Sequence, residues 1–270
     1  MLGERWGAEV NRIDKKFKEL RKAKKKAFIV FITAGYPDLN TTYKLILEFS
    51  RIGVDIIELG VPFTDPMADG PVIQESSQKA LEKGADLDKI FNLVRKARLR
   101  TGIPIGLMTY YNPVFCMGEG NFLKRAKNAG VDGVIIPDLP PEEGKGLVRK
   151  ARKIGIDTVF FVSPTSSTRR IKLNAQYSSG FIYYVSLTGT TGARKKISQD
   201  LAKNIRAIKK LTLKPVCAGF GISNAAQVKE VNRFADGVIV GSAVVNKIRE
   251  NLGKPGLASK VSRFVSGLRG

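Results

Sequence analysis

The chain has 270 residues, of which 43% are hydrophobic and 26% charged, an ordinary balance for a soluble globular protein. It contains no histidine, which excludes Ser-His-Asp and Cys-His nucleophilic systems, imidazole acid–base catalysis and histidine metal sites. The net charge of +22 is compatible with an anionic substrate, an acidic partner or nucleic acid, but the basic residues are spread over many predicted helices without interleaved aromatics.

Nothing in the sequence indicates a membrane or an export signal. No apolar run approaches the ~20 residues of a membrane-spanning helix, and the first residues lack an apolar signal core. Cys116 and Cys217 lie far apart and show no metal-ligand spacing. We therefore expect a cytoplasmic protein with two reduced thiols and no metal site.

Short β-branched runs alternate with amphipathic stretches along the whole chain. The predicted strands are Ala27–Thr33, Val54–Glu58, Ile103–Met108, Gly133–Ile136, Thr158–Val162, Phe181–Val185, Pro215–Ala218 and Gly237–Val240. The predicted helices include Asp14–Lys25, Thr41–Ile52, Pro71–Lys83, Asn121–Ala129, Glu142–Ile154 and Ala225–Arg233. Near-continuous apolar runs are typical of parallel strands buried on both faces. Eight strand signals, each followed by a helix signal, predict one (β/α)8 TIM barrel over residues 1–270, with an extra N-terminal helix covering its bottom.

The segment Glu58–Pro71 is the most informative part of the chain. Glu58 ends the second predicted strand, and Asp65 and Asp69 follow in a stretch rich in Pro and Gly that predicts a loop. In a barrel, an acid at the carboxyl end of a strand lies on the catalytic face. Burial there raises the pKa of a carboxyl group, so Glu58 is predicted to donate and accept protons near neutral pH.

Three glycine-rich loops follow the sixth, seventh and eighth predicted strands. They are Thr188–Ala193, Gly219–Ser223 and Gly241–Ala243. Backbone N–H groups in such loops and at helix N-termini bind anions, and the last two loops of a barrel are its usual phosphate site. Large apolar residues are expected beneath this site, namely Phe31, Leu107, Tyr110, Phe161, Tyr183 and Phe220. A flat apolar substrate with a phosphorylated tail would fit such a mouth.

With these elements the chain resembles the family of tryptophan synthase α subunits. The resemblance runs in order through Phe31–Pro37, Glu58–Pro71, Tyr110–Phe115, Ile136–Pro140, Gly189–Gly192, Gly219–Ser223 and Gly241–Ala243. It implies a lyase that cleaves indole-3-glycerol phosphate by retro-aldol chemistry into indole and glyceraldehyde 3-phosphate, as part of tryptophan biosynthesis.

The resemblance also implies residue roles. Glu58 would protonate the indole ring and activate the glycerol hydroxyl, and Asp69 would stabilise positive charge on the indole nitrogen. The remaining substrate-binding positions implied by the family are Tyr183, Thr191, Gly192, Phe220, Gly221, Gly241 and Ser242.

A partner is implied as well. The family works with a β subunit in an α2β2 heterotetramer, and the β subunit alone would carry pyridoxal phosphate, so this chain is expected to need no cofactor. Asp65, Pro66, Asn112 and Phe115 match the partner-contacting positions.

Three alternatives to this reading stay open. The chain could release indole without a partner, or it could act chiefly as an activator of a partner or bind nucleic acid through its basic faces. It could also be another phosphate-binding barrel, such as an isomerase of phosphorylated sugars, although the complete Glu58–Pro71 element argues against that.

Overall fold

Parallel strands form the centre of the molecule. The computed structural model describes residues 11–185, 199–219 and 221–269. The strand segments are β1 (Ala27–Thr33), β2 (Ile56–Gly60), β3 (Ile105–Met108), β4 (Gly133–Ile135), β5 (Asp157–Val159), β6 (Phe161–Val162), β7 (Ile182–Val185), β8 (Val216–Gly219) and β9 (Gly237–Val240). They lie side by side in the order β5-β4-β3-β2-β1-β9-β8-β7-β6.

The two ends of this order belong to one strand of the barrel. Only Phe160 separates β5 from β6, and β5 pairs with β4 while β6 pairs with β7. The segment therefore bridges both edges and closes the sheet, so that nine strand segments make eight barrel strands. The predicted (β/α)8 barrel is confirmed, and the break inside its fifth strand was not predicted.

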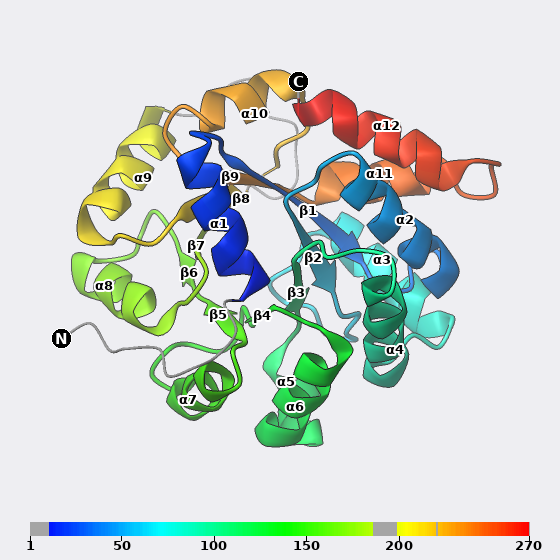
Figure 1. Ribbon diagram of the computed structural model, residues 1–270, viewed down its shortest axis with the longest axis horizontal. Helices are drawn as coiled ribbons and strands as arrows, with labels where there is room; N and C mark the ends of the chain where they lie inside the picture. The colour runs from blue at the N-terminus through cyan, green and yellow to red at the C-terminus, as the bar shows by residue number, and fades with distance from the viewer. Residues whose placement is uncertain (1–10, 186–198, 220, 270) are drawn as a thin grey trace.

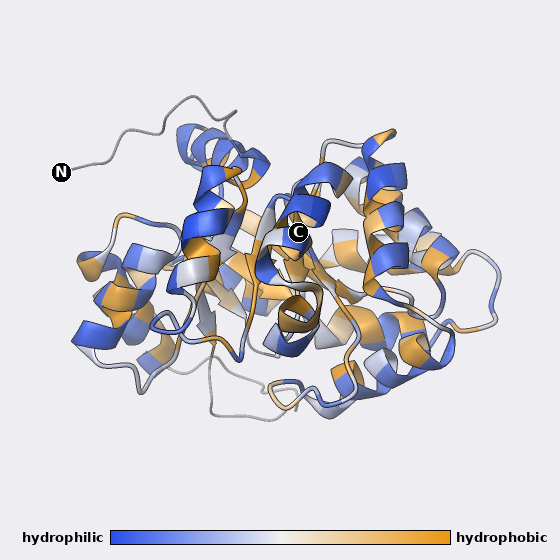
Figure 2. Ribbon diagram, turned by 90° about the horizontal axis from the view of Figure 1, so that it is seen from below, coloured by the Kyte–Doolittle hydropathy of each residue, from blue (hydrophilic) through white to orange (hydrophobic). Residues whose placement is uncertain are grey.

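Helices surround the strands: α1 crosses one end of the barrel, and the others form an outer ring (Figure 1). They are α1 (Arg12–Lys22), α2 (Leu39–Arg51), α3 (Pro71–Glu82), α4 (Leu87–Arg98), α5 (Tyr111–Met117), α6 (Glu119–Ala129), α7 (Lys145–Lys153), α8 (Thr168–Tyr177), α9 (Gln199–Leu211), α10 (Ala225–Val231), α11 (Ser242–Arg249) and α12 (Leu257–Arg269). Figure 2 shows the hydrophobic stripes of these helices turned inward and their hydrophilic stripes turned to solvent. The predicted helices are present, with ends that differ by a few residues.

The extra N-terminal helix closes the bottom of the barrel, as predicted. In Figure 1 α1 crosses the end of the barrel that faces the viewer. Its buried residues Ile13, Phe17 and Leu20 join the apolar cluster inside the barrel, and the ring of Phe17 lies 5.7 Å from that of Phe181. Asn11 caps the helix and donates hydrogen bonds to two backbone carbonyls of the barrel bottom. Water is thus excluded from the lower barrel.

The alternation of side chains along β2 decides where the acid lies. Ile56 belongs to the apolar cluster inside the barrel, and because strand side chains alternate, Glu58 also points inward, one layer higher. Its Cα pairs with those of Phe31 and Gly106. The barrel therefore places one carboxyl group above a dry apolar core.

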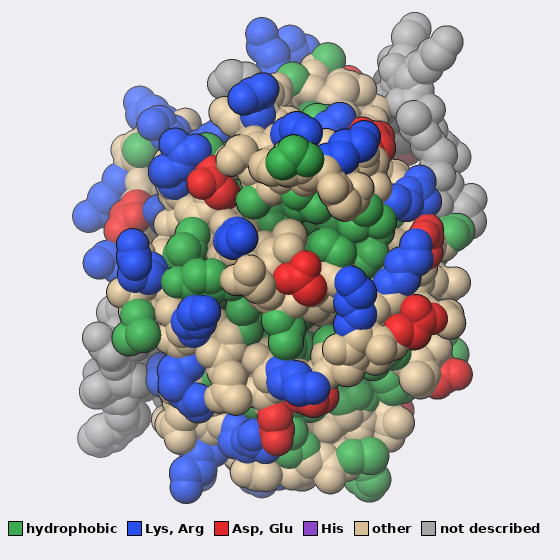
Figure 3. Space-filling view, turned by 90° about the vertical axis from the view of Figure 1, so that its right-hand side faces the viewer, with side chains coloured by type: hydrophobic (Ala, Val, Ile, Leu, Met, Phe, Trp, Pro, Cys, Tyr) green, Lys and Arg blue, Asp and Glu red, His purple; other side chains and the backbone are tan. Residues whose placement is uncertain are grey.

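The basic side chains are spread over the outside. On the face shown in Figure 3, Lys and Arg lie among apolar, neutral and acidic side chains and do not form one continuous patch. Among the described residues, no helix is both long and apolar enough to pass through a bilayer.

Candidate active site

A cavity of about 690 Å³ opens at the carboxyl ends of the strands. Phe31, Met108, Phe161 and Tyr183 come from the strands, and Met108, Phe161 and Tyr183 rest on the apolar cluster inside the barrel. The rim includes Asp69 from the loop after β2, and Gly221, Gly241 and Ser242 from the two loops at the end of the chain. The cavity thus has an apolar floor, one acid on its rim and a glycine-rich side.

Glu58 is not among the described residues that line the cavity, but its neighbour on β1, Phe31, is. The Glu58 side chain is 1% exposed, and neither carboxylate oxygen has a well-aligned hydrogen bond. The Tyr183 hydroxyl is close enough to favour the ionised form, yet burial dominates. Desolvation, helped by the negative charge of Asp69, raises the pKa of Glu58 to about 8. The acid is therefore held in its neutral form at pH 7, as a proton donor requires.

Two glycines make room for the aromatic rings around Glu58. A Cβ at Gly60 would lie 2.5 Å from the Phe31 ring, and one at Gly219 would lie 2.7 Å from the Tyr183 hydroxyl. Such distances are far below van der Waals contact, so any side chain there would displace a ring. Gly219 thus has a packing role in addition to opening the seventh loop.

Asp69 is held in place by Tyr110. The Tyr110 hydroxyl donates to Asp69 Oδ2 over 3.1 Å and accepts the Ala68 N–H over 2.9 Å. The Tyr110 ring stacks on Phe63 of the same loop with 5.1 Å between centroids. Burial raises the pKa of Asp69 to about 6, while the Tyr110 hydrogen bond lowers it. Asp69 is therefore mainly ionised at neutral pH, opposite a neutral Glu58.

The glycine-rich side of the cavity has the features of an anion site. The eight-residue helix α11 begins at Ser242, and Gly241 and Ser242 both line the cavity. Gly221 has a φ of +44°, a conformation that glycine adopts readily. The N-terminal N–H groups of α11 and its dipole favour a phosphate here.

Two predicted substrate-binding residues lie elsewhere. Leu107 is fully buried in the cluster between strands and helices, because its neighbour Met108 takes the inward position on β3. Tyr110 stands behind Asp69 and is not among the described residues that line the cavity. Tyr110 positions Asp69 through its hydroxyl. From the sequence alone, this role could not be distinguished from direct contact with the substrate. Three further predicted residues, Thr191, Gly192 and Phe220, lie outside the described residues.

The sequence analysis did not predict that residues following the fifth barrel strand line the cavity. Ser163, Ser166, Arg170 and Asn174 line the cavity from β6 onward. Ser166 accepts the Ser163 N–H, which fixes the turn, and Asn174 donates to the Phe161 carbonyl. Their position directly after a barrel strand was the available signal, since this edge is where barrel sites form.

The predicted partner-contacting residues follow β2 and β3: Asp65 and Pro66 lie in the loop after β2, and Asn112 and Phe115 lie on α5. Asp65 and Asn112 are exposed, Pro66 is half-buried, and Phe115 is 68% exposed. Met67 beside them is 83% exposed. Met67 in the loop after β2 and Phe115 on α5 are thus two large apolar side chains exposed to water, a feature of surfaces that bind a protein partner.

The fold is a closed (β/α)8 barrel, and its site combines a buried acid with a cavity that has a glycine-rich side suited to phosphate. These features are typical of one class of protein, the barrel enzymes that act on phosphorylated substrates. The family model "Tryptophan synthase alpha chain" matches residues 17–266. A relative of that name from Thermoanaerobacter sp. is 47% identical over 260 residues, which cover 96% of this chain and 99% of the relative.

Solved structures agree with the family model. Tryptophan synthase subunit alpha from Legionella pneumophila str. Paris has a TM-score of 0.90 at 37% identity, covering 97% of this chain and 98% of that one. The α chain of a tryptophan synthase α2β2 complex from Pyrococcus furiosus has a TM-score of 0.85 at 40% identity, covering 90% and 97%. The chain belongs to the tryptophan synthase alpha chain family, and the predicted membership is confirmed.

Replacing Tyr110 by Phe tests how Asp69 is held. Loss of the hydroxyl removes the hydrogen bond that lowers the pKa of Asp69, so this pKa rises above about 6. The acid limb of the kcat/KM profile then moves to higher pH, and activity at pH 7 falls about tenfold, since hydrogen bonds to charged groups contribute about 1.5–3 kcal/mol. Tyr111→Phe is the control, because that hydroxyl bonds to Glu119. An unmoved acid limb would contradict the assignment.

Replacing Glu58 by Gln tests its burial through stability. The pKa of Glu58 is about 8 in the folded state, above its ordinary value of 4.5. Between these values the folded state binds the extra proton, so the wild type loses stability as pH rises through this window. In chemical denaturation, the free energy of unfolding of Glu58→Gln should rise relative to that of the wild type from pH 4.5 upward, by up to about 5 kcal/mol above pH 8. Glu82→Gln, on the exposed side of α3, is the control. A pH-independent difference would refute the desolvated acid.

Proposed function

We propose that Glu58 and Asp69 together carry out the family reaction, the retro-aldol cleavage of indole-3-glycerol phosphate to indole and glyceraldehyde 3-phosphate in tryptophan biosynthesis. The chain is, as a member of this family, a carbon–carbon lyase. The observation that carries the assignment of roles is the contrast in the surroundings of the two acids. Glu58 is buried without a well-aligned hydrogen bond, whereas Asp69 lines the cavity and accepts a hydrogen bond from Tyr110, which fits a pKa of about 8 for Glu58 and about 6 for Asp69.

The reaction needs one proton to enter and one to leave. Neutral Glu58 gives its proton to indole C3, and the positive charge that this creates on the ring nitrogen is stabilised by the Asp69 carboxylate. Ionised Glu58 then takes the proton of the adjacent glycerol hydroxyl. The C3–glycerol bond breaks, its electron pair returns to the ring, and an aldehyde forms as indole leaves. Glu58 ends protonated, as it began.

Binding follows from the two sides of the cavity. Phe31 and Tyr183 offer apolar surface to the indole ring, and the α11 N-terminus with Gly221, Gly241 and Ser242 would hold the phosphate. Thr191, Gly192 and Phe220 are assigned to the substrate through the resemblance alone.

A β subunit is the proposed partner. The Pyrococcus furiosus relative is described in an α2β2 complex with mutual activation. Asp65, Pro66, Asn112 and Phe115 form the proposed docking surface, supported by the exposure of Phe115 and Met67. Pyridoxal phosphate is assigned to the β subunit, and the reaction to the cytoplasm, in keeping with two free cysteines.

Indole release from purified protein tests this function. With indole-3-glycerol phosphate, Glu58→Gln should lower kcat at least about a thousandfold and Asp69→Asn at least about a hundredfold, with small changes in KM. Glu82→Gln should match the wild type. Adding a β subunit should raise wild-type activity, and Phe115→Asp should abolish that rise while leaving basal turnover intact.

Other outcomes distinguish the alternatives. Wild-type activity that ignores the β subunit would indicate a stand-alone lyase. Full activity in Glu58→Gln would refute the catalytic pair, and no cleavage under any condition would refute the enzyme.

A further inference from the structure

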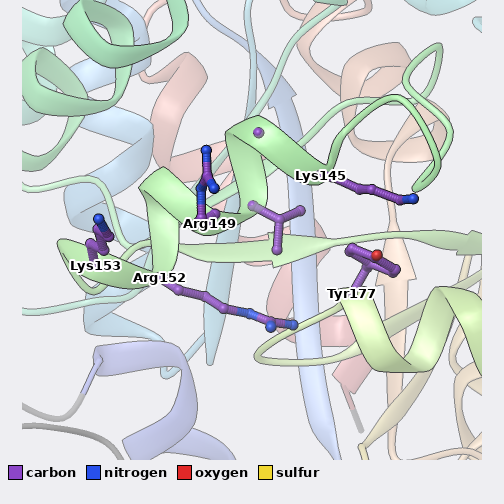
Figure 4. Close-up of a pocket in the computed structure, with 7 residues that line it drawn as sticks. Lys145, Arg149, Arg152, Lys153 and Tyr177 are labelled. Carbon is purple, nitrogen blue, oxygen red and sulfur yellow. The ribbon is translucent and has the colours of Figure 1, made fainter.

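A second cavity, of about 510 Å³, lies on the outer wall between α7 and the end of α8. Lys145, Arg149, Arg152 and Lys153 line it from α7, and Tyr177 lines it from the last position of α8 (Figure 4). The four cations are spaced i, i+4, i+7 and i+8, which places them along one helical face. None of the described lining residues is acidic. We call this cavity the α7 groove.

The charge of the α7 groove is not neutralised within the described residues. Lys150, on the same helix but outside the groove, forms a 2.8 Å ion pair with Glu119. Lys145, Arg149 and Lys153 have no such ion pair in the described part of the chain. The charge of Lys145 helps to lower the pKa of Glu142, but Glu142 forms its ion pair with Arg170, at 2.6 Å. Like charges one turn apart repel, so four of them on one face favour binding of a multiply charged anion.

The apolar side of the groove is also defined. Val148 is buried and lines the groove, and the half-buried Tyr177 ring is braced edge-on by Phe160 at 6.5 Å between centroids. Arg152 donates to the Gln176 carbonyl, and its side chain extends toward Tyr177 in Figure 4. A ring fixed in this way offers a stacking surface at low entropic cost.

We propose that the α7 groove binds a nucleoside polyphosphate, a ligand separate from the substrate of the cavity at the strand ends. Arg149, Lys153 and Lys145 contact the phosphates, since guanidinium and ammonium groups both donate to phosphate oxygens. The base stacks on Tyr177. The volume of this open groove, about 510 Å³, with one aromatic residue among the described lining, suits a single nucleotide. An extended nucleic acid strand would need several stacking positions along a continuous basic track.

Calorimetric titration of the full chain tests the proposal with ATP, ADP, AMP, adenosine and tripolyphosphate. We expect ATP to bind at least tenfold more tightly than AMP, and the affinity to fall as salt rises. Arg149→Gln with Lys153→Gln should weaken ATP at least tenfold. Lys150→Gln, which removes one charge from the same helix, should change it less than twofold. Tyr177→Leu should weaken ATP about fivefold and leave tripolyphosphate unchanged. Indole release and the melting temperature confirm that each variant is folded.

Three results would overturn the proposal. Equal ATP affinity in the wild type and the double variant would place any binding elsewhere, including the phosphate side of the substrate cavity. Tripolyphosphate binding as tightly as ATP would indicate an anion patch without base recognition. An oligonucleotide whose affinity exceeds that of ATP and grows with length would indicate a nucleic-acid surface.

Discussion

The burial of Glu58 without a well-aligned hydrogen bond is the constraint on which the rest of the site depends. A carboxyl group at 1% exposure is costly to ionise, so the fold holds it neutral well above the pH at which a free glutamic acid loses its proton. This is achieved by the apolar surroundings of the acid. Helix α1 seals the barrel below, and Phe31 and Tyr183 lie beside Glu58, with their rings in space left by Gly60 and Gly219.

The second acid has the opposite environment. Asp69 sits in a loop at the cavity rim, where the Tyr110 hydroxyl donates to it and partly offsets the effect of burial. Its negative charge adds to the effect of burial in raising the pKa of Glu58. Two carboxyl groups with separated pKa values in one site can serve as proton donor and charge stabiliser at the same pH.

The sequence predicted the barrel because its signals are local and repeated. Apolar runs of strand length recur with helices between them, and Glu58 stands at the end of one run, so its place on the catalytic face follows from strand direction. The alternation within β3 was not resolved, because Ile105–Met108 is apolar at three of four positions and does not reveal which side faces inward. Leu107 was therefore assigned in place of Met108.

Other features depend on contacts between distant segments. The hydrogen bond from the Tyr110 hydroxyl to Asp69 joins two loops. The packing roles of Gly60 and Gly219 arise only when the rings of Phe31 and Tyr183 lie against them. The α7 groove likewise needs the end of α8 beside α7. Such placements follow from the closed barrel and have no counterpart in any single stretch of sequence.

The ionisation of Glu58 is the most direct test of this account. In protein with carbon-13 at its glutamate carboxyl groups, the Glu58 resonance can be identified by its absence from Glu58→Gln and followed from pH 4 to 10. A midpoint near 8, moving to lower pH in Asp69→Asn, is the predicted result. A midpoint near the ordinary value of 4.5 would show that Glu58 is ionised at neutral pH and would contradict its role as the proton donor.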